Sequence, residues 1–224
     1  MPDYFTHCIA AELIYERLDE EHKRILAGNK TLYMLGAQGG DVFFFYGLSY
    51  RHNAGRMLHR MAPCELFEKL ADGNAAYCAG WATHYALDCT VHPFVYAYEE
   101  THKGAFLHQR YERDLGLYVS RRCGMRRMVL PKDKVLDCTF AVCDSVKKLL
   151  PYITAAGTAN CLKRHFSYSL RQFKTKKQQF ELDCDYSQVF KAFERGVELG
   201  VKAAACALDK NIDGDIFNKS FLQR

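Results

Sequence analysis

Two pairs of histidine and carboxylate residues, each four positions apart, lie in the first half of the chain. His84 and Asp88 occur in HYALD, and His108 and Glu112 occur in HQRYE. In an α-helix this spacing places both side chains on one face, about one turn apart. Neutral imidazole and carboxylate groups are the ligands that Zn²⁺ and similar divalent ions take in proteins. Because two such pairs on consecutive antiparallel helices can converge on one place, the sequence predicts a metal centre.

Either pair alone has an ordinary alternative explanation, a solvated salt bridge on a helix surface. The neighbours of His84 argue against it, because WATHYAL is apolar and contains Trp81 and Tyr85. A buried imidazole needs a polar partner, which Asp88 or a metal ion would supply. His92 follows at the expected end of the same helix. These residues therefore favour a buried site over a solvated helix face.

The elements that must position these residues are helical in pattern, with apolar residues at intervals of three and four. The apolar run at 43–51 is compatible with a strand or a buried helix, and Pro93 is expected to end the helix before it. Without alternating strands, internal repeats or a dividing linker, we expect one domain over 1–224, an all-α, multi-helix bundle with a metal cluster between helices. The expected helices cover residues 6–27, 30–36, 63–72, 74–91, 98–118, 131–150, 158–173 and 186–208.

The composition is that of a soluble globular protein. The 224 residues are 49% hydrophobic and 25% charged, with a net charge of +5, which is too small to demand a nucleic-acid partner. No apolar run approaches the roughly 20 residues of a transmembrane helix. The chain begins without the pattern of a secretory signal, and its ten cysteines show no CxxC or framework-like spacing. We therefore expect a cytoplasmic protein with free thiols.

Five short segments follow one another in an order that resembles a known family. They are Thr6-His7, GAQGGD (36–41), GRMLHR (55–60), HYALDCTVHP (84–93) and HQRYE (108–112). Each is weak alone, but HxxxD followed by HP and then HxxxE is a specific sequence. Over about residues 1–115 the chain resembles the bacterial zinc-dependent phospholipase C family, whose superfamily also contains zinc-dependent single-strand nucleases.

The resemblance implies eight zinc ligands in three sets. They are Asp41, His59, His84 and Asp88 for one ion, His92, His108 and Glu112 for a second, and His7 with the bridging Asp88 for a third. In secreted members of the family an N-terminal Trp completes the third set, whereas this chain begins Met1-Pro2-Asp3, and Asp3 is the available substitute. We therefore expect two zinc ions, with a third dependent on His7.

The implied activity is that of a metal-dependent phosphoric-diester hydrolase. A zinc-bound hydroxide would attack phosphorus while the cations neutralise the phosphoryl oxygens. Asp41 is the candidate catalytic residue, a ligand that would also orient or deprotonate the attacking water. The expected substrate is a phosphate ester, with a phospholipid headgroup as the first candidate. A nuclease or phosphatase using the same cluster, or a non-catalytic cytoplasmic binding protein stabilised by metal, are the alternatives.

Two further patterns bear on the partner. The aromatic run Phe43–Tyr46 could line a pocket for a quaternary ammonium headgroup through cation–π contacts, although such runs are more often core. The basic stretches at 121–134 and 163–177 could contact an anionic membrane or a nucleic-acid strand. With so small a net charge, solvated faces are the simpler explanation, and nucleic acid is the less favoured partner.

Overall fold

The computed structural model describes residues 4–47, 52–174 and 179–221, and in these ranges every regular element is a helix. One isolated bridge pairs Gly47 with Asn53. The expected all-α fold is confirmed. In chain order the helices are α1 (Tyr4–Arg17), α2 (Glu20–Ala27), α3 (Lys30–Gly36), the 3₁₀-helix η1 (Gly39–Phe45), α4 (Ala54–Leu58), α5 (Pro63–Ala71), α6 (Ala75–Thr101), α7 (Leu107–Cys123), α8 (Lys132–Asp137), α9 (Thr139–Lys147), α10 (Ala155–Lys174) and α11 (Ser187–Leu208).

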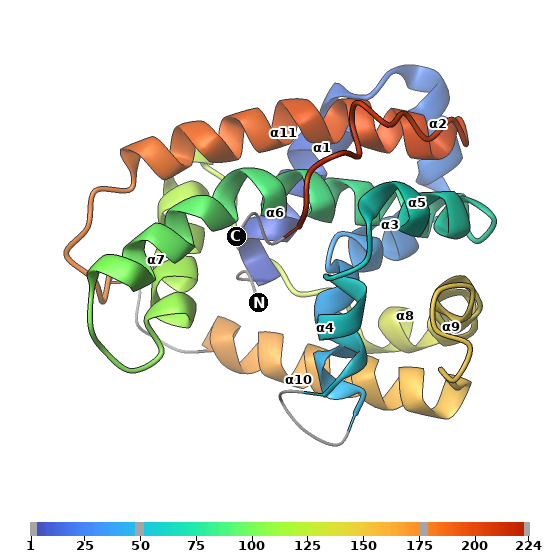
Figure 1. Cartoon of the computed structure of the whole chain (residues 1–224), viewed down its shortest axis with the longest axis horizontal. Coiled ribbons are helices and arrows are strands. Elements are labelled where there is room, and N and C mark those ends of the chain that lie inside the picture. The colour runs from blue at the N-terminus through green and yellow to red at the C-terminus, as the bar shows by residue number, and fades with distance from the viewer. Residues whose placement is uncertain (1–3, 48–51, 175–178, 222–224) are drawn as a thin grey trace.

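The long helix α6 is the centre of the fold. Every residue from Ala76 to Cys89 is buried, so this part of the helix is covered on all sides. Figure 1 shows α11 running beside α6, with α10 on the opposite side of the molecule. Helix α6 packs against α11, α3, α1 and α7. A helix enclosed by helices from both halves of the chain can present its polar side chains only to an interior site.

Small residues let α3 approach α6 closely. A Cβ atom added at Gly36 would lie 2.2 Å from the carbonyl oxygen of Tyr77, and one added at Gly80 would lie 2.1 Å from that of Tyr33. Both distances are well inside van der Waals contact with rigid backbone. The first glycine of the GAQGGD segment therefore brings the following 3₁₀-helix against the centre of α6.

Three of the expected helices are interrupted. The single helix expected over 6–27 is two, because the Asp19 carboxylate accepts a hydrogen bond from the backbone N–H of His22 at 2.9 Å and caps α2. The helix expected over 131–150 is divided at Cys138. The stretch 98–118 is broken by a loop, and Phe106 adopts a φ of +55° immediately before α7.

The expected helix end at Pro93 is wrong, because α6 continues through it to Thr101. A proline inside a helix loses one backbone hydrogen bond and costs about 3 kcal/mol. Residues on both sides, His92 and Val95, are buried, and their packing holds the helix together across the proline. Of the run at 43–51, left open between strand and helix, residues 43–45 form the end of η1, and residues 48–51 lie outside the described residues.

The chain after α11 returns across the molecule as an extended tail, drawn red in Figure 1. Phe217 packs against Phe67 and Tyr85 with ring centroids 4.3 and 5.4 Å apart. Phe221 is fully buried, and its ring centroid lies 5.7 Å from that of His59. The tail therefore covers one side of the region in which the predicted ligands lie.

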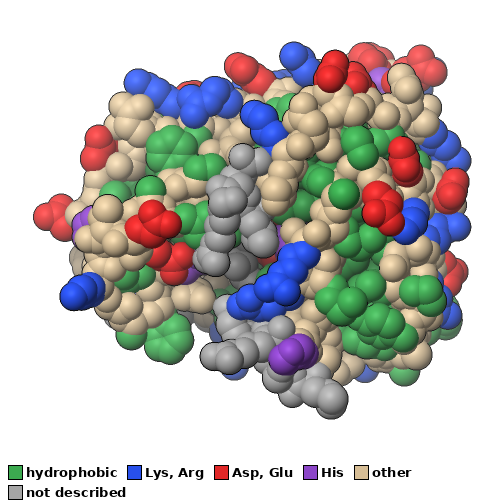
Figure 2. Space-filling view, in the orientation of Figure 1, with side chains coloured by type: hydrophobic (Ala, Val, Ile, Leu, Met, Phe, Trp, Pro, Cys, Tyr) green, Lys and Arg blue, Asp and Glu red, His purple; other side chains and the backbone are tan. Residues whose placement is uncertain are grey.

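The basic stretches are spread over the surface. On the face drawn in Figure 2, Lys and Arg side chains are interspersed with Asp and Glu, and part of 163–177 lies outside the described residues. Several guanidinium groups cover aromatic rings of the protein, such as Arg121 over Phe180 at 4.9 Å and Arg127 over Phe5 at 5.1 Å.

Among the described helices none is long and apolar enough to cross a bilayer. All ten cysteines are free, as expected.

Candidate metal centre

All eight sequence-predicted ligand positions lie in one interior region, where they are supplied by five elements. Seven of these side chains are buried and His108 is half-buried. By element, they are His7 on α1, Asp41 on η1, His59 at the C-cap of α4, His84, Asp88 and His92 on α6, and His108 and Glu112 on α7. The structure therefore brings together all of the side chains that the sequence singled out.

The carboxylate of Asp88 lies at the centre of this region and faces four imidazoles. Its Oδ2 atom lies 3.2 Å from Nε2 of His84, 3.6 Å from Nε2 of His59 and 3.8 Å from Nδ1 of His92. Its Oδ1 atom lies 3.4 Å from Nε2 of His7. The two oxygens of one buried carboxylate thus face different sets of histidines, which is an arrangement suited to bridging two ions.

Three of the donor atoms, Nε2 of His59, Nε2 of His84 and Oδ2 of Asp88, are spaced like one face of a zinc tetrahedron. Nε2 of His59 lies 3.4 Å from Oδ1 of Asp41 and 3.3 Å from Nε2 of His84. These separations, together with those to Oδ2 of Asp88, cluster around the ~3.3 Å edge of a tetrahedron with metal–ligand bonds of about 2.0–2.1 Å. His59, His84 and Asp88 are therefore geometrically able to share one ion, and Asp41 lies next to His59 at the edge of this set.

A second set joins α6 to α7. Nε2 of His92 lies 3.5 Å from Oε1 of Glu112, and Nε2 of His108 lies 2.7 Å from the same oxygen. One donor atom from each of these three residues falls within 4.8 Å of the others. His108 and Glu112, the i, i+4 pair on α7, thus meet His92, the last of the three candidate ligands on α6, as expected for consecutive antiparallel helices.

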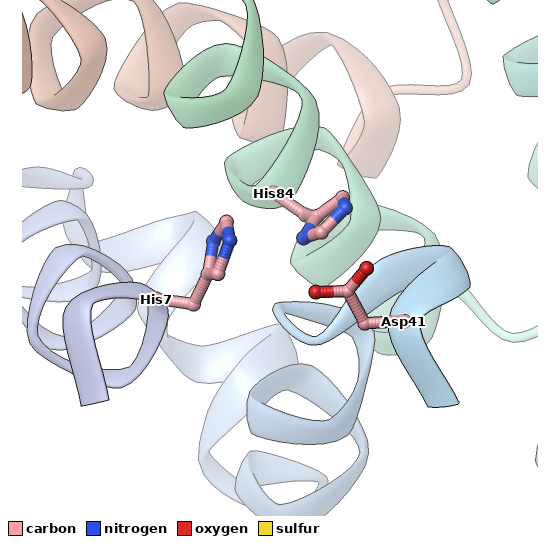
Figure 3. A group of neighbouring side chains, drawn as sticks. All are labelled: His7, Asp41 and His84. Carbon is pink, nitrogen blue, oxygen red and sulfur yellow. The ribbon is translucent and has the colours of Figure 1, made fainter. Parts of the chain in front are cut away.

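A third grouping is centred on the N-terminal helix. Figure 3 shows His7, Asp41 and His84 pointing toward one another from α1, η1 and α6. Their donor atoms also lie within 4.8 Å of one another, and the rings of His7 and His84 are stacked with centroids 4.4 Å apart. Asp3, the substitute for an N-terminal Trp, lies outside the described residues.

Contacts behind the ligands direct the imidazoles inward. Nδ1 of His59 lies 2.7 Å from the Gly55 carbonyl oxygen, to which it donates, and Nδ1 of His108 lies 2.9 Å from a carboxylate oxygen of Glu99. An N–H donated outward from Nδ1 leaves the lone pair of Nε2 for a metal ion, which is the usual support for ligating histidines.

A comparison with family models identifies the chain. Residues 6–158, more than two thirds of its length, match the model described as zinc-dependent phospholipase C. The chain belongs to the zinc-dependent phospholipase C family. The match extends well beyond the 1–115 over which the motifs resemble that family. Searches of curated proteins and of solved structures returned no match.

The family's glycine-rich segment makes room for two of the candidate ligands. Gly39 has a φ of +50°, and a Cβ atom there would lie 2.3 Å from Cδ2 of His84. At Gly40 a Cβ atom would lie 2.7 Å from Cε1 of His59. Only glycine fits such close approaches, and the left-handed backbone at Gly39 favours it further. The segment therefore sets both the position of Asp41 and the space for the imidazoles opposite.

The region is electrostatically costly without a cation. Burial raises the pKa of Asp41 to about 6 and, with neighbouring His84, lowers the pKa of His59 to about 3. Burial opposes charge on His92, but the carboxylates of Asp88 and Glu112 raise its pKa to about 9. Buried carboxylates are stable as anions only beside a compensating positive charge. A bound divalent ion would supply that charge in place of protons on the histidines.

Unpaired buried atoms are the direct test of whether this family's zinc ions fit the residues present. Among the described residues, several nitrogen and oxygen atoms of the candidate ligand residues are buried without a hydrogen-bond partner; they are Nε2 of His7, Oδ1 of Asp41, Nδ1 of His84, both carboxylate oxygens of Asp88 and Nε2 of His92. Leaving such atoms unsatisfied is costly. Imidazole and carboxylate are zinc's preferred donors, so the residues fit the group.

A pocket of about 800 Å³ leads to these donors. Asp41, His59, His92 and His108 contribute to its wall. Of the aromatic run, Phe43 is fully buried, while Phe44 and Phe45 line the pocket. The run is therefore divided between the core and the substrate-sized opening, and binding of a quaternary ammonium headgroup there stays a prediction.

Sequence reasoning missed two residues that contact candidate ligands, and one further buried histidine. Glu99 orients His108 from the end of α6, and the Phe221 carbonyl oxygen lies 3.4 Å from Nδ1 of His92. His165 on α10 is buried, with both ring nitrogens lacking a hydrogen-bond partner among the described residues. Glu99 carries a weak signal, because it lies two helical turns after His92; the others depend on contacts far apart in the chain.

Proposed function

We propose that this protein is a zinc-dependent phosphodiester hydrolase of the phospholipase C type, acting on a phospholipid-like substrate. One observation carries the proposal: Nε2 of His59, Nε2 of His84 and Oδ2 of Asp88 lie 3.2–3.6 Å from one another, close enough to share a zinc ion, and His59 and Asp41 also line a substrate-sized pocket. Family membership supports the same chemistry.

We propose the ligand sets that the family pattern implies. Asp41, His59, His84 and Asp88 would hold one zinc ion, and His92, His108 and Glu112 a second. Asp88 would bridge to a third ion beside His7, in accord with the 3.4 Å from its second oxygen to that imidazole. Zinc ions so placed supply a water of lowered pKa and positive charge for the phosphoryl oxygens.

The protein's own residues would position the substrate and the zinc ions. His59, His92 and His108 line the pocket, and their imidazole nitrogens would face the zinc ions from its wall. Phe44 and Phe45 line the same pocket and would limit access of bulk water. Asp41 is the proposed proton-accepting carboxylate, because it lines the pocket beside His59 and a carboxylate placed there can accept a proton from the attacking water.

The test joins metal content to turnover. Untagged protein purified without added metal is analysed by elemental mass spectrometry, then assayed with a short-chain phospholipid, a single-stranded oligonucleotide and a phosphomonoester. We expect two or more zinc equivalents, lost in His84→Ala, and hydrolysis of the phospholipid. Metal with oligonucleotide or monoester cleavage alone would assign the cluster to the nuclease or phosphatase alternative. Metal without any turnover would favour a non-catalytic binding protein.

A further inference from the structure

The segment that follows α11, the tail of residues 209–221, lies outside the residues that match the family model, which end at 158. Residues 209–221 form turns and bends and contain no helix or strand. Even so, Phe217 and Phe221 are 1% and 0% exposed. Ordering such a segment costs conformational entropy, which its contacts with the rest of the protein must offset.

Tyr85 on α6 anchors the tail. Its hydroxyl donates a hydrogen bond to the carbonyl oxygen of Ile216 and accepts one from the backbone N–H of Lys219, each at 3.1 Å. Its ring packs against those of Phe217 and Phe221, with centroids 5.4 and 5.1 Å apart. Figure 1 shows the tail returning from the end of α11 toward α6. The helix that carries three candidate ligands therefore also holds the tail.

Phe221 contacts histidines of both proposed zinc sets. Its ring centroid lies 5.7 Å from that of His59 and 6.4 Å from that of His84, two residues of the first set. Its carbonyl oxygen lies 3.4 Å from Nδ1 of His92, a residue of the second set. An N–H donated from Nδ1 to this carbonyl leaves the lone pair of Nε2 for a metal ion. One residue of the tail thus borders both sets.

The tail takes no part in lining the pocket that leads to the donors. Among the described lining residues, none comes from 209–221. The contacts of the tail with this region are therefore with the candidate ligands and not with the substrate-sized opening.

We propose that the tail is a functional part of the metal centre: Tyr85 holds it closed, and Phe221 positions histidines of both zinc sets, so that the tail determines how long the ions stay bound. Residues that orient metal ligands from behind typically change metal affinity by about 10- to 100-fold. Phe221 is a positioning residue in this scheme, because it acts through the imidazoles that it contacts. This inference rests on the zinc sites of the proposed function and adds the element that retains the ions.

The rate of metal release measures retention. Zinc-loaded protein is mixed with an excess of a chromogenic chelator, and the visible spectrum of the cobalt-substituted protein reports the ligand geometry. In Phe221→Ala we expect zinc release to be about 10- to 100-fold faster and the cobalt spectrum to change, because the ring beside His59 and His84 is lost. In Tyr85→Phe we expect release to be roughly tenfold faster with the wild-type spectrum, because the tail loses two hydrogen bonds but keeps its contacts with the histidines when it is seated.

Two further variants separate retention from general stability. Phe193 on α11 is 1% exposed and stacks on Phe190 with centroids 5.9 Å apart, so Phe193→Ala removes a similarly buried ring away from the candidate ligands. We expect it to lower the thermal midpoint while zinc release and the cobalt spectrum stay as in the wild type. Phe221→Leu keeps an apolar side chain and replaces Phe221→Ala where the alanine variant does not fold; release should again be faster, with a changed spectrum.

A thiol beside the ligands reports closure of the tail without any metal. Cys89 follows Asp88 on α6 and is 5% exposed. Burial and the Asp88 carboxylate raise the pKa of its thiol to about 12, while the Lys219 ammonium on the tail opposes them, so the tail lies near this thiol. Alkylation of Cys89, followed by peptide mass spectrometry, should be faster in Tyr85→Phe than in the wild type. Cys143 on α9, which is 1% exposed, should react equally in both.

The outcomes are distinct for the two proposals. Wild-type release rates in both the Phe221 and the Tyr85 variants, or an equal acceleration in Phe193→Ala, overturn the inference. If zinc binds but no phosphate ester is hydrolysed, the proposed catalysis fails, and the release rates still decide the role of the tail. If the wild-type protein binds no zinc, the proposed function fails and the labelling decides: faster reaction at Cys89 alone in Tyr85→Phe supports the tail as the closing element, and equal rates reject it.

Discussion

Nδ1 of His108 lies 2.9 Å from Oε2 of Glu99, so that a carboxylate near the end of α6 orients an imidazole at the start of α7. This contact fixes which ring nitrogen faces the candidate metal site. It also joins two helices through a pair of residues only nine positions apart. The first prediction follows from it.

Glu99→Gln should weaken zinc binding by about 10- to 100-fold while the helical fold is retained, because the oriented imidazole loses its charged acceptor. The measurement is zinc affinity by competition with a chromogenic chelator. Glu100→Gln is the matched control, since Glu100 is exposed on the same turn. Equal affinities in the two variants would show that Glu99 does not support the ligand.

Asp88→Asn should remove most bound zinc and, with it, hydrolysis. The substitution replaces one oxygen of a carboxylate that faces four imidazoles with an amide nitrogen, which cannot ligate and reduces the negative charge of the site. Elemental mass spectrometry and the phospholipid assay on the same preparation check this. A variant with wild-type zinc content and rate would exclude a bridging role.

Asp114→Asn should have the opposite profile. Oδ2 of Asp114 accepts hydrogen bonds from the backbone N–H groups of Glu181 and Leu182 at 2.7 and 2.8 Å, and the side chain is fully buried. Disturbing one such bond should lower the free energy of unfolding by about 1–3 kcal/mol. Urea unfolding measures the loss, while zinc content should match the wild type. Zinc loss in a folded Asp114→Asn protein would contradict the separation of structural and ligand carboxylates.

Gly39→Ala should displace His84 and lower both zinc affinity and the thermal midpoint. The added methyl group would lie 2.3 Å from the imidazole, in a left-handed backbone that itself costs about 1 kcal/mol or more for alanine. Gly28→Ala is the control, because nothing lies within 4 Å of its added Cβ and its φ is −78°. Similar behaviour of the two variants would show that the crowding is relieved elsewhere.

A pH-dependent contact ties the start of α2 to the end of α11. His22 lies 2.8 Å from an Asp19 oxygen and 3.1 Å from one of Asp209, and although burial opposes its charge, these carboxylates raise its pKa above 6.5. The contacts of protonated His22 with Asp19 and Asp209 therefore stabilise the fold fully below the pKa that His22 has in the unfolded chain. This contribution is lost as the pH rises through the higher pKa that His22 has in the folded protein.

Asp209→Asn should accordingly lower the thermal midpoint most at about pH 5.5–6, below the unfolded histidine pKa of roughly 6.5, and progressively less above it. Thermal melts across pH measure the difference from wild type. In a His22→Asn background the effect of Asp209→Asn should no longer depend on pH over this interval. A difference that grows with pH would contradict the sign of the shift.

The identities of the site residues could be predicted because their information is local. His84 and Asp88, and His108 and Glu112, are four residues apart, and helix geometry alone places each pair on one face. The helical class likewise follows from short-range periodicity, and the family motifs are contiguous segments. Each of these features depends only on residues that are close together in the sequence.

The boundaries and supports could not be predicted in the same way. Pro93 favours a helix end locally, yet burial on both sides carries α6 through it. Asp19 is the cap that divides one amphipathic stretch into two helices, and the sequence pattern does not distinguish a cap from a surface acid. The cost of one backbone hydrogen bond is small beside the packing of a buried helix, so tertiary contacts decide.

By itself the sequence determined the all-helical class, the eight candidate ligand positions and the family to be tested. Only the tertiary structure decided that His7, Asp41 and His84 meet, that Phe221 and Glu99 support histidines, and that Arg56 and Arg60 share the pocket. The physical reason is that spacing along one helix is fixed by the backbone, whereas contacts between different helices, such as that of His7 with His84, depend on how each helix packs on α6.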